Sequence, residues 1–181
     1  SYQVGYCPSS SKALVTFMDK NGFSLKDLEN AKLCYGDKMF YSDRIVFPIM
    51  DRQSRVISFS GRIYKEANKD ESKYKNGSES QIFKKGLVLF GLNNAVAEIK
   101  KSGKVYLVEG QIDCIKMQEF GYPNTIATLG TSLTDEHLTL LADLASPLDL
   151  IVVYDSDKGG KNATQRIVDL VDESKSDKIT V

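Results

Sequence analysis

The sequence has 181 residues, enough for one substantial hydrophobic core or for two small ones. Its hydrophobic fraction of 41% and its equal numbers of basic and acidic residues are those of an ordinary globular protein and exclude a disordered chain. No apolar run approaches the length of a membrane span, and the first residues lack the pattern of a signal peptide. Three widely spaced cysteines without a CxxC pair argue against a disulfide framework or a local zinc site and predict a cytoplasmic protein.

The charged residues are unevenly divided along the chain. Residues 1–104 contain 18 Lys or Arg and 11 Asp or Glu, whereas residues 105–181 contain 6 and 13. A basic half joined to an acidic half is typical of an enzyme that binds a polyanion and holds a metal ion. A chance segregation of charge is the alternative.

The first 40 residues are predicted to form packing elements, and two strands are expected to follow them. Two helices are expected, the first after one of the serines at positions 9–11 and the second capped by Ser24. Two strands, over 44–51 and 55–64, are expected to be joined by a tight turn. Pro48 in the first strand indicates an edge position or a bulge.

The stretch 65–86 is the most polar part of the chain and has the composition of a loop. Lysines alternate here with aromatic residues, at Lys73, Tyr74, Lys75, Phe83, Lys84 and Lys85. Cations beside aromatic rings suit a path for single-stranded nucleic acid, where the backbone is charged and the bases stack. A solvated loop without function is the alternative.

From residue 87 onward, strands and helices are predicted to alternate. An amphipathic helix from Asn93 or Asn94 to Lys101 precedes strands over 105–108, 125–129 and 148–154, each followed by a helix. Such alternation favours right-handed crossovers and a parallel sheet. The helix after residue 131 is expected to be capped by Ser132 or Thr134, with Asp135 at capping-box spacing from Ser132. His137 in this helix is expected to lie on the surface.

Carboxylates follow two of these strands. Glu109 ends one strand and Asp113 lies in the next helix, while Asp155 and Asp157 follow the other strand. The carboxyl ends of parallel strands form the ligand-binding edge of an open α/β sheet, so we expect the four acids to meet there. Carboxylates crowded together require cations between them, and hard oxygen ligands suit Mg²⁺ or Mn²⁺.

A structural explanation exists for three of these acids. Asp113 could interact with a helix dipole, and Asp155 and Asp157 could be turn and N-cap residues. Glu109 is harder to explain in this way, because a carboxylate that ends a buried strand is costly unless it is paired or metal-bound. Metal ions held by acids would serve phosphoryl or nucleotidyl transfer, with Lys158 and Lys161 in reach of phosphate oxygens. No P-loop and no GxGxxG fingerprint is present, so neither a P-loop ATPase nor a Rossmann dehydrogenase is supported.

The segments VEGQID and YDSDKGG together resemble the Toprim domain. This domain also occurs in topoisomerases, nucleases and recombination proteins. In addition, the segments RIVFPIMDRQSRVISFSGRIY, SKYKNGSES, IFKKGLVLFGL and ATLGTSLTDEH are similar, in order and spacing, to the catalytic core of bacterial replicative DNA primases of the DnaG type.

The resemblance implies an enzyme, a DNA-directed RNA polymerase that synthesises short RNA primers from ribonucleoside triphosphates with Mg²⁺ or Mn²⁺. Its fold would be α/β, with a basic α+β part over 1–90 and a Toprim parallel-sheet domain over 91–181, truncated at its C-terminus. By position, the family's metal-binding and catalytic acids correspond to Glu109, Asp113, Asp155 and Asp157. The residues that match its nucleic-acid and nucleotide contacts are Arg62, Lys73, Tyr74, Asn76 and Lys85, and those that match a loop beside the metals are Gly130, Thr131 and Ser132.

The partners implied by the resemblance are a single-stranded DNA template, nucleoside triphosphates and, through a C-terminal domain outside this sequence, the replicative helicase. Zinc would belong to the family's N-terminal domain, which also lies outside the sequence. The implied location is the bacterial cytoplasm, at the replisome and nucleoid. A phage- or plasmid-type primase or primase-helicase is one alternative, and a Toprim fragment that binds single-stranded DNA without synthesis is another.

Overall fold

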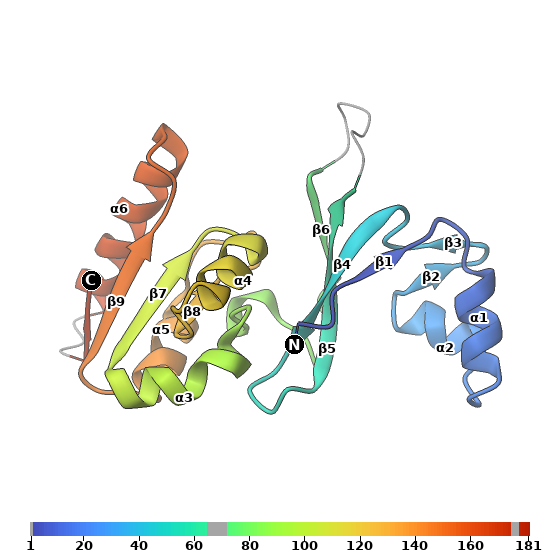
Figure 1. Ribbon diagram of the computed structural model, residues 1–181, viewed down its shortest axis with the longest axis horizontal. Coiled ribbons are helices and arrows are strands. Elements are labelled where there is room, and N and C mark those ends of the chain that lie inside the picture. Colours follow the sequence, from blue (N-terminus) through green and yellow to red (C-terminus); the bar gives the residue numbers. More distant parts are fainter. Residues whose placement is uncertain (1, 65–71, 175–177) are drawn as a thin grey trace. The chain divides into compact units, whose positions relative to one another are not determined.

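The computed structural model describes residues 2–64, 72–174 and 178–181 (Figure 1). By internal contacts the chain divides into two compact units, one made of Ser1–Ile49 and Ser58–Ser78 and the other of Met50–Ile57 and Glu79–Val181. In the described ranges, no helix is both long and apolar enough to cross a membrane. Residues 65–71 of the predicted polar loop lie outside the described residues.

The first unit is built on an antiparallel sheet with strand order β1-β4-β5-β6. Its elements are β1 (Gly5–Cys7), α1 (Lys12–Asp19), α2 (Leu25–Asn30), β2 (Cys34–Tyr35), β3 (Lys38–Met39), β4 (Arg44–Met50), β5 (Val56–Ile63) and β6 (Tyr74–Asn76). The two helices and the two strands predicted before residue 65 are therefore confirmed. Pro48 lies in the part of β4 beyond its pairing with β1, which ends at Val46, so its missing N–H disturbs no ladder there.

Local capping explains where the two helices begin. Ser24 forms a capping box with Asp27 at the start of α2, as a serine before a helical run predicts. Ser11 occupies the N-cap position of α1, but its hydroxyl donates to the Gly36 carbonyl and does not cap the helix. Strand β6 was not predicted, because three residues within a polar stretch are too few to show a period of two.

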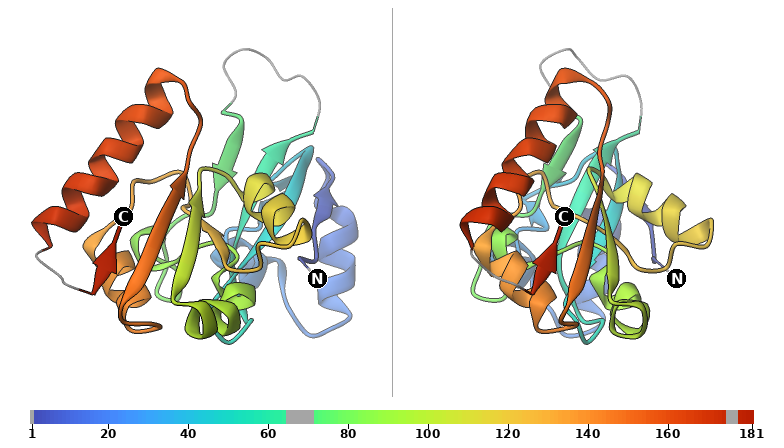
Figure 2. Two further views of the ribbon diagram at one scale, coloured as in Figure 1. Left: turned by 60° about the vertical axis from the view of Figure 1, so that its left-hand side comes forward. Right: turned by 90° about the vertical axis from the view of Figure 1, so that its left-hand side faces the viewer.

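The second unit is a parallel sheet with strand order β10-β9-β7-β8. Its elements are the 3-10 helix η1 (Lys85–Leu87), α3 (Leu92–Ser102), β7 (Lys104–Val108), α4 (Gln111–Glu119), β8 (Thr125–Ala127), α5 (Asp135–Ala142), β9 (Leu148–Val153), α6 (Lys158–Glu173) and β10 (Ile179–Thr180). Figure 2 shows α3 and α4 on one face of the sheet and α5 and α6 on the other. The predicted alternation of strand and helix is confirmed, and the strands are apolar because both faces are covered.

Two details of this unit differ from the sequence-based expectations. Thr134, one of the two predicted N-caps, does cap α5, but the capping box joins it to His137 and does not join Ser132 to Asp135. The His137 N–H donates to the Thr134 hydroxyl and the Thr134 N–H to Nδ1 of His137. His137 is 0% exposed, so the prediction of a surface residue was wrong. Its ring is turned inward by the cap, and burial lowers the pKa of the imidazole.

Helix α6 begins at Lys158, with Asp157 as its N-cap. Gly160 is buried in its first turn, against the backbone of Asp155 that follows β9. A Cβ at position 160 would overlap that backbone, so the absence of a side chain is what lets the helix begin so close to the strand end.

We expect Gly160→Ala to lower the free energy of unfolding by about 1–3 kcal/mol, because the methyl group must displace either α6 or the strand end. Gly86→Ala is the control, since a Cβ there would contact only the side chain of Thr134, at an ordinary 3.6 Å. Urea denaturation of both variants measures the difference. Equal stabilities would contradict the packing described for Gly160.

The burial of His137 predicts a pH dependence. The unfolded chain takes up a proton near the ordinary pKa of 6.5, whereas the folded chain resists it, so the free energy of unfolding should fall as the pH drops below about 6.5. His137→Asn keeps a hydrogen-bond acceptor and cannot titrate. We expect its stability to change less than that of the wild type between about pH 7.5 and about pH 5.5, measured by denaturation at each pH. Parallel profiles would show that His137 is not responsible.

Candidate active site

The ends of three neighbouring parallel strands define the candidate site. Val108 of β7 is paired with Ala127 of β8 and with Val153 of β9. The next residues along the strands, Glu109, Thr128 and Tyr154, therefore leave the sheet at the same level. This edge is where ligands bind in open α/β sheets.

Two of the four predicted acids are brought into direct contact. The Asp155 backbone N–H donates to Oε1 of Glu109 at 3.1 Å, which joins the ends of β9 and β7. Glu109 and Asp155 are both exposed. A carboxylate from one strand end thus lies against the backbone of the other, although 46 residues separate them in the sequence.

The other two acids lie at the first turns of the helices that follow. Asp113 is in the first turn of α4, and its Oδ2 lies 2.8 Å from the position that a Cβ on Gly110 would occupy. Asp157 caps α6, since its Oδ1 accepts the Gly160 N–H at 2.8 Å. The structural roles considered for these two residues are therefore present. Among the described residues, no hydrogen bond is formed by the second carboxylate oxygen of Asp157 or by either carboxylate oxygen of Asp113.

The chemistry of these side chains fits a hard divalent cation. All four are carboxylates, all four are exposed, and none forms an ion pair within the part of the chain that the structure describes. In that same part, no group of three or more His, Cys, Asp or Glu is close enough to hold a metal ion. The structure thus brings Glu109 and Asp155 together without gathering the full set predicted from the sequence.

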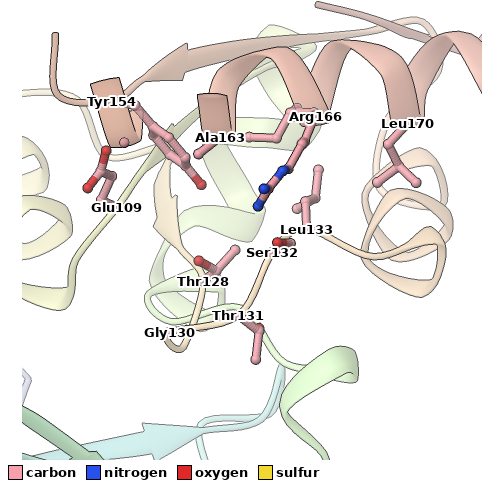
Figure 3. Close-up of a pocket in the computed structure, with 12 residues that line it drawn as sticks. Glu109, Thr128, Gly130, Thr131, Ser132, Leu133, Tyr154, Ala163, Arg166 and Leu170 are labelled. Atoms are coloured by element: carbon pink, nitrogen blue, oxygen red, sulfur yellow. The ribbon is translucent and has the colours of Figure 1, made fainter. Parts of the chain in front are cut away.

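A pocket of about 390 Å³ opens beside these strand ends (Figure 3). Its walls are formed by Glu109 from β7, the segment after β8, Tyr154 from β9 and one side of α6. The lining residues are Glu109, Thr128, Gly130, Thr131, Ser132, Leu133, Tyr154, Gly159, Ala163, Arg166, Ile167 and Leu170. The loop residues Gly130, Thr131 and Ser132 thus share a pocket with Glu109, and the αL conformation of Gly130 (φ 71°) makes the turn into this loop.

Tyr154 is a polar group of the pocket that the sequence did not suggest. Burial raises the pKa of its phenol, a hydrogen bond with Thr128 lowers it, and the nearby charge of Glu109 raises it again. The net change is upward, so the hydroxyl keeps its proton and remains a hydrogen-bond donor at neutral pH.

Arg166 was also missed. It lies on α6 and lines the pocket together with Gly159, Ala163 and Leu170. These positions recur at intervals of three and four residues, which is the spacing of one helix face. A helical wheel that starts at Gly159 would have placed Arg166 on the same face of the helix as Gly159, which lies next to the strand end.

The two lysines predicted to meet phosphate oxygens lie in the first turn of α6. Lys158 and Lys161 are exposed and close in sequence to Asp157, but neither lines the pocket. Lys85, from the other predicted set, lies in η1, and its backbone N–H donates to the side chain of Glu79. The Thr134 hydroxyl donates to the Gly86 carbonyl at 2.8 Å, so η1 is tied to the start of α5.

The remaining predicted contact residues lie together in the first unit, on the β5–β6 ladder. Arg62 is paired with Tyr74, and its guanidinium carbon lies 5.7 Å from the centre of the tyrosine ring. Asn76 is paired with Ser60, two residues along from Arg62, so it shares the face of the sheet with Tyr74. The carbonyl of Lys73 accepts the Ile63 N–H, which places this lysine at the open end of the same ladder.

Lys75 behaves differently from its neighbours. It lies on the opposite face of the ladder, where its ammonium group donates to the Phe40 carbonyl at 2.7 Å and lies 3.9 Å from the centre of the Phe40 ring. The buried Arg44 donates to the carbonyls of Gly61, Ser72 and Lys73 and fixes the end of the ladder. The ammonium group of Lys75 therefore has a structural role within the first unit.

Comparison with known proteins identifies the family. Residues 1–96 match the family described as DNA primase catalytic core, N-terminal domain, and residues 103–181 match the Toprim domain. The DNA primase of Chlamydia muridarum is 39% identical over 169 residues, which are 93% of this chain and 28% of that protein.

Solved primase structures share the fold. The Aquifex aeolicus primase, in a structure of its zinc-binding and RNA polymerase domains, has a TM-score of 0.85 and 35% identity and is matched over 94% of this chain and 42% of its own. A DnaG primase catalytic domain bound to single-stranded DNA has a TM-score of 0.79 and 28% identity, with 98% of this chain and 56% of that chain covered. This chain spans less than a third of the length of the curated relative and about half of the solved chains. With both halves matched in order, the chain belongs to the family of DNA primase catalytic cores of the DnaG type.

Proposed function

We propose that this chain carries the nucleotidyl-transfer site of a DNA primase, which synthesises short RNA primers from nucleoside triphosphates on a single-stranded DNA template. The observation that carries the proposal is the contact between Glu109 and Asp155 at adjacent strand ends of a Toprim sheet. It brings acids from two separate motifs to the ligand-binding edge of the sheet. Replication at the nucleoid is the corresponding location, and the replicative helicase is a proposed partner of the whole protein.

Toprim primases generally use divalent metal ions. We infer that Mg²⁺ or Mn²⁺ would be held by Glu109, Asp155, Asp157 and Asp113, whose donor atoms suit these ions. When bound, the ions supply neutralisation of the negative charge that develops on the phosphates.

The side chains of this chain have further proposed roles in the reaction. The attacking hydroxyl belongs to the growing primer, so the absence of a nucleophilic side chain at the strand ends is consistent with the mechanism. Lys158 and Lys161 lie beside Asp157 and attract phosphate oxygens at the start of α6, where the helix dipole acts in the same direction. The loop of Gly130, Thr131 and Ser132 closes the pocket next to Glu109 and limits the access of water.

The β5–β6 ladder is the proposed template contact of the first unit. Arg62 and Lys73 supply positive charge, Tyr74 a ring for stacking on a base, and Asn76 a side-chain amide on the same face as Tyr74. Lys85 is the proposed nucleic-acid contact of the second unit.

Binding of single-stranded DNA without synthesis is a second candidate function. It is favoured by one observation, namely that the four acids do not form a group of three or more in the described residues. The two functions differ in whether the wild-type protein forms primers and whether their formation requires the acids, and the next experiment separates them.

We expect Glu109→Gln and Asp155→Asn, each in the full-length protein, to reduce primer synthesis about 100-fold or more, because each removes a carboxylate that would hold a divalent metal ion. Synthesis is measured as incorporation of labelled nucleotides on a single-stranded template with Mn²⁺. Asp149→Asn is the matched control, since this exposed carboxylate lies in β9 at the opposite end of the strand. Wild-type synthesis by the two site variants would refute the proposed role of these acids. Binding of the template by a wild-type protein that makes no primer would leave DNA binding as the function.

For the ladder, we expect Arg62→Ala and Lys73→Ala to weaken binding of a single-stranded oligonucleotide and to reduce the slope of log K against log salt by about 0.7 each, since each phosphate contact releases counterions. Tyr74→Ala should weaken binding by about 1–3 kcal/mol with an unchanged slope, because stacking releases no ions. Lys26→Ala removes an exposed charge from α2 of the same unit and should change neither quantity. Fluorescence anisotropy at several salt concentrations measures all four variants. A slope that stays constant in the Arg62 and Lys73 variants would exclude them as phosphate contacts.

A further inference from the structure

Among the residues that the structure describes, Arg166 is the one basic residue that lines the pocket beside the strand ends. In Figure 3 its side chain extends from α6 toward Thr128 and Ser132. Arg166 is exposed, and its guanidinium group forms no ion pair or hydrogen bond in the part of the chain that the structure describes. A guanidinium that points into a pocket and is not matched by a carboxylate is suited to an anionic ligand.

Residues with hydroxyl groups line the same pocket. Thr128, Thr131 and Ser132 come from the segment that follows β8, and Tyr154 follows β9. In Figure 3, Thr128 and Ser132 lie beside the end of the Arg166 side chain, whereas Thr131 points away from it. A guanidinium with hydroxyl groups beside it supplies donors for several oxygen atoms, which matches a phosphate better than a single carboxylate.

The rest of the lining is apolar and strengthens these interactions. Ala163, Ile167 and Leu170 of α6 form one wall and Leu133 another. Ile167 is 3% and Leu133 is 6% exposed. The wall of the pocket behind the hydrogen-bond donors is therefore part of the hydrophobic core and not solvent. Charge-assisted hydrogen bonds are stronger where the surroundings are less polar.

The position of the acids gives the pocket two chemically distinct ends. Glu109 is the one carboxylate in the lining, and it contacts the backbone of Asp155 at the strand ends. Arg166 approaches from α6, nine residues beyond the capping Asp157. A ligand that fits the pocket places an anionic group beside Arg166 and its reacting atoms beside the acids.

We propose that the pocket is the subsite for the terminal phosphates of the incoming nucleoside triphosphate and that Arg166 is the side chain that binds them. The inference rests on the proposed nucleotidyl transfer and names the substrate portion that the pocket takes. In the transfer, the primer hydroxyl oxygen forms a bond to the α-phosphorus and its proton passes to water, while the bond between the α-phosphorus and the bridging oxygen breaks and the β- and γ-phosphates leave as pyrophosphate. Arg166 holds this leaving group, while Lys158 and Lys161 lie outside the pocket.

The binding test uses inorganic pyrophosphate and the 181-residue chain in metal-free buffer, followed by ³¹P NMR. We expect Arg166→Ala to weaken pyrophosphate binding about tenfold or more, since it removes a charged bidentate donor. Lys101→Ala is the charge-matched control, because this lysine lies at the end of α3, just before β7 begins, and should bind as the wild type does. If Arg166→Ala does not fold, Arg166→Gln keeps the aliphatic stem and should show a similar loss. Wild-type affinity in the folded variant would overturn the inference.

A kinetic test in the full-length protein separates this inference from the proposed reaction. We expect Arg166→Ala to raise KM for nucleoside triphosphates about tenfold, with a smaller change in kcat and with the affinity and salt slope for the template unchanged. If the Glu109 and Asp155 variants lose synthesis while Arg166→Ala keeps both its KM and its pyrophosphate affinity, the subsite alone is wrong. If the acidic variants retain synthesis, the proposed reaction fails, and loss of pyrophosphate binding in Arg166→Ala would still establish the anion site.

Discussion

The rest of the site depends on the hydrogen bond that the Asp155 N–H donates to the Glu109 carboxylate. It can form because β7 and β9 are parallel neighbours in register, with Val108 opposite Val153. The apolar residues of both strands hold that register by burial between two layers of helices. A shift of one residue would turn Glu109 to the other face and separate it from Asp155.

Close packing at α6 complements this contact. Gly160 lies against the backbone of Asp155, so the helix begins directly above the strand end, and the Asp157 carboxylate caps it. The direction of α6 then decides which side chains reach the pocket, among them Arg166 and Leu170. The acids at the strand ends and the arginine nine residues after Asp157 are therefore parts of one arrangement whose geometry is set by a glycine.

Much of this organisation could be predicted from the sequence, because its signals are local. The apolar runs of β7 and β9, the carboxylates that end them and the glycines that follow can all be read within a few residues. What could not be predicted depends on tertiary contacts: the short strand β6 needs β5 as a partner, and the burial of His137 follows from the way Thr134 turns its ring inward. Thr128 and Tyr154 are ordinary strand-end residues by sequence, and the pocket gives them a chemical role.

Thr134 has a consequence that reaches beyond the capping of α5. Its hydroxyl accepts the His137 N–H and donates to the Gly86 carbonyl, so the loop that enters α5 and the short helix that carries Lys85 are held by the same oxygen atom. Loss of this one hydroxyl would therefore remove two contacts at once, the cap at the start of α5 and the bond that holds η1 beside it.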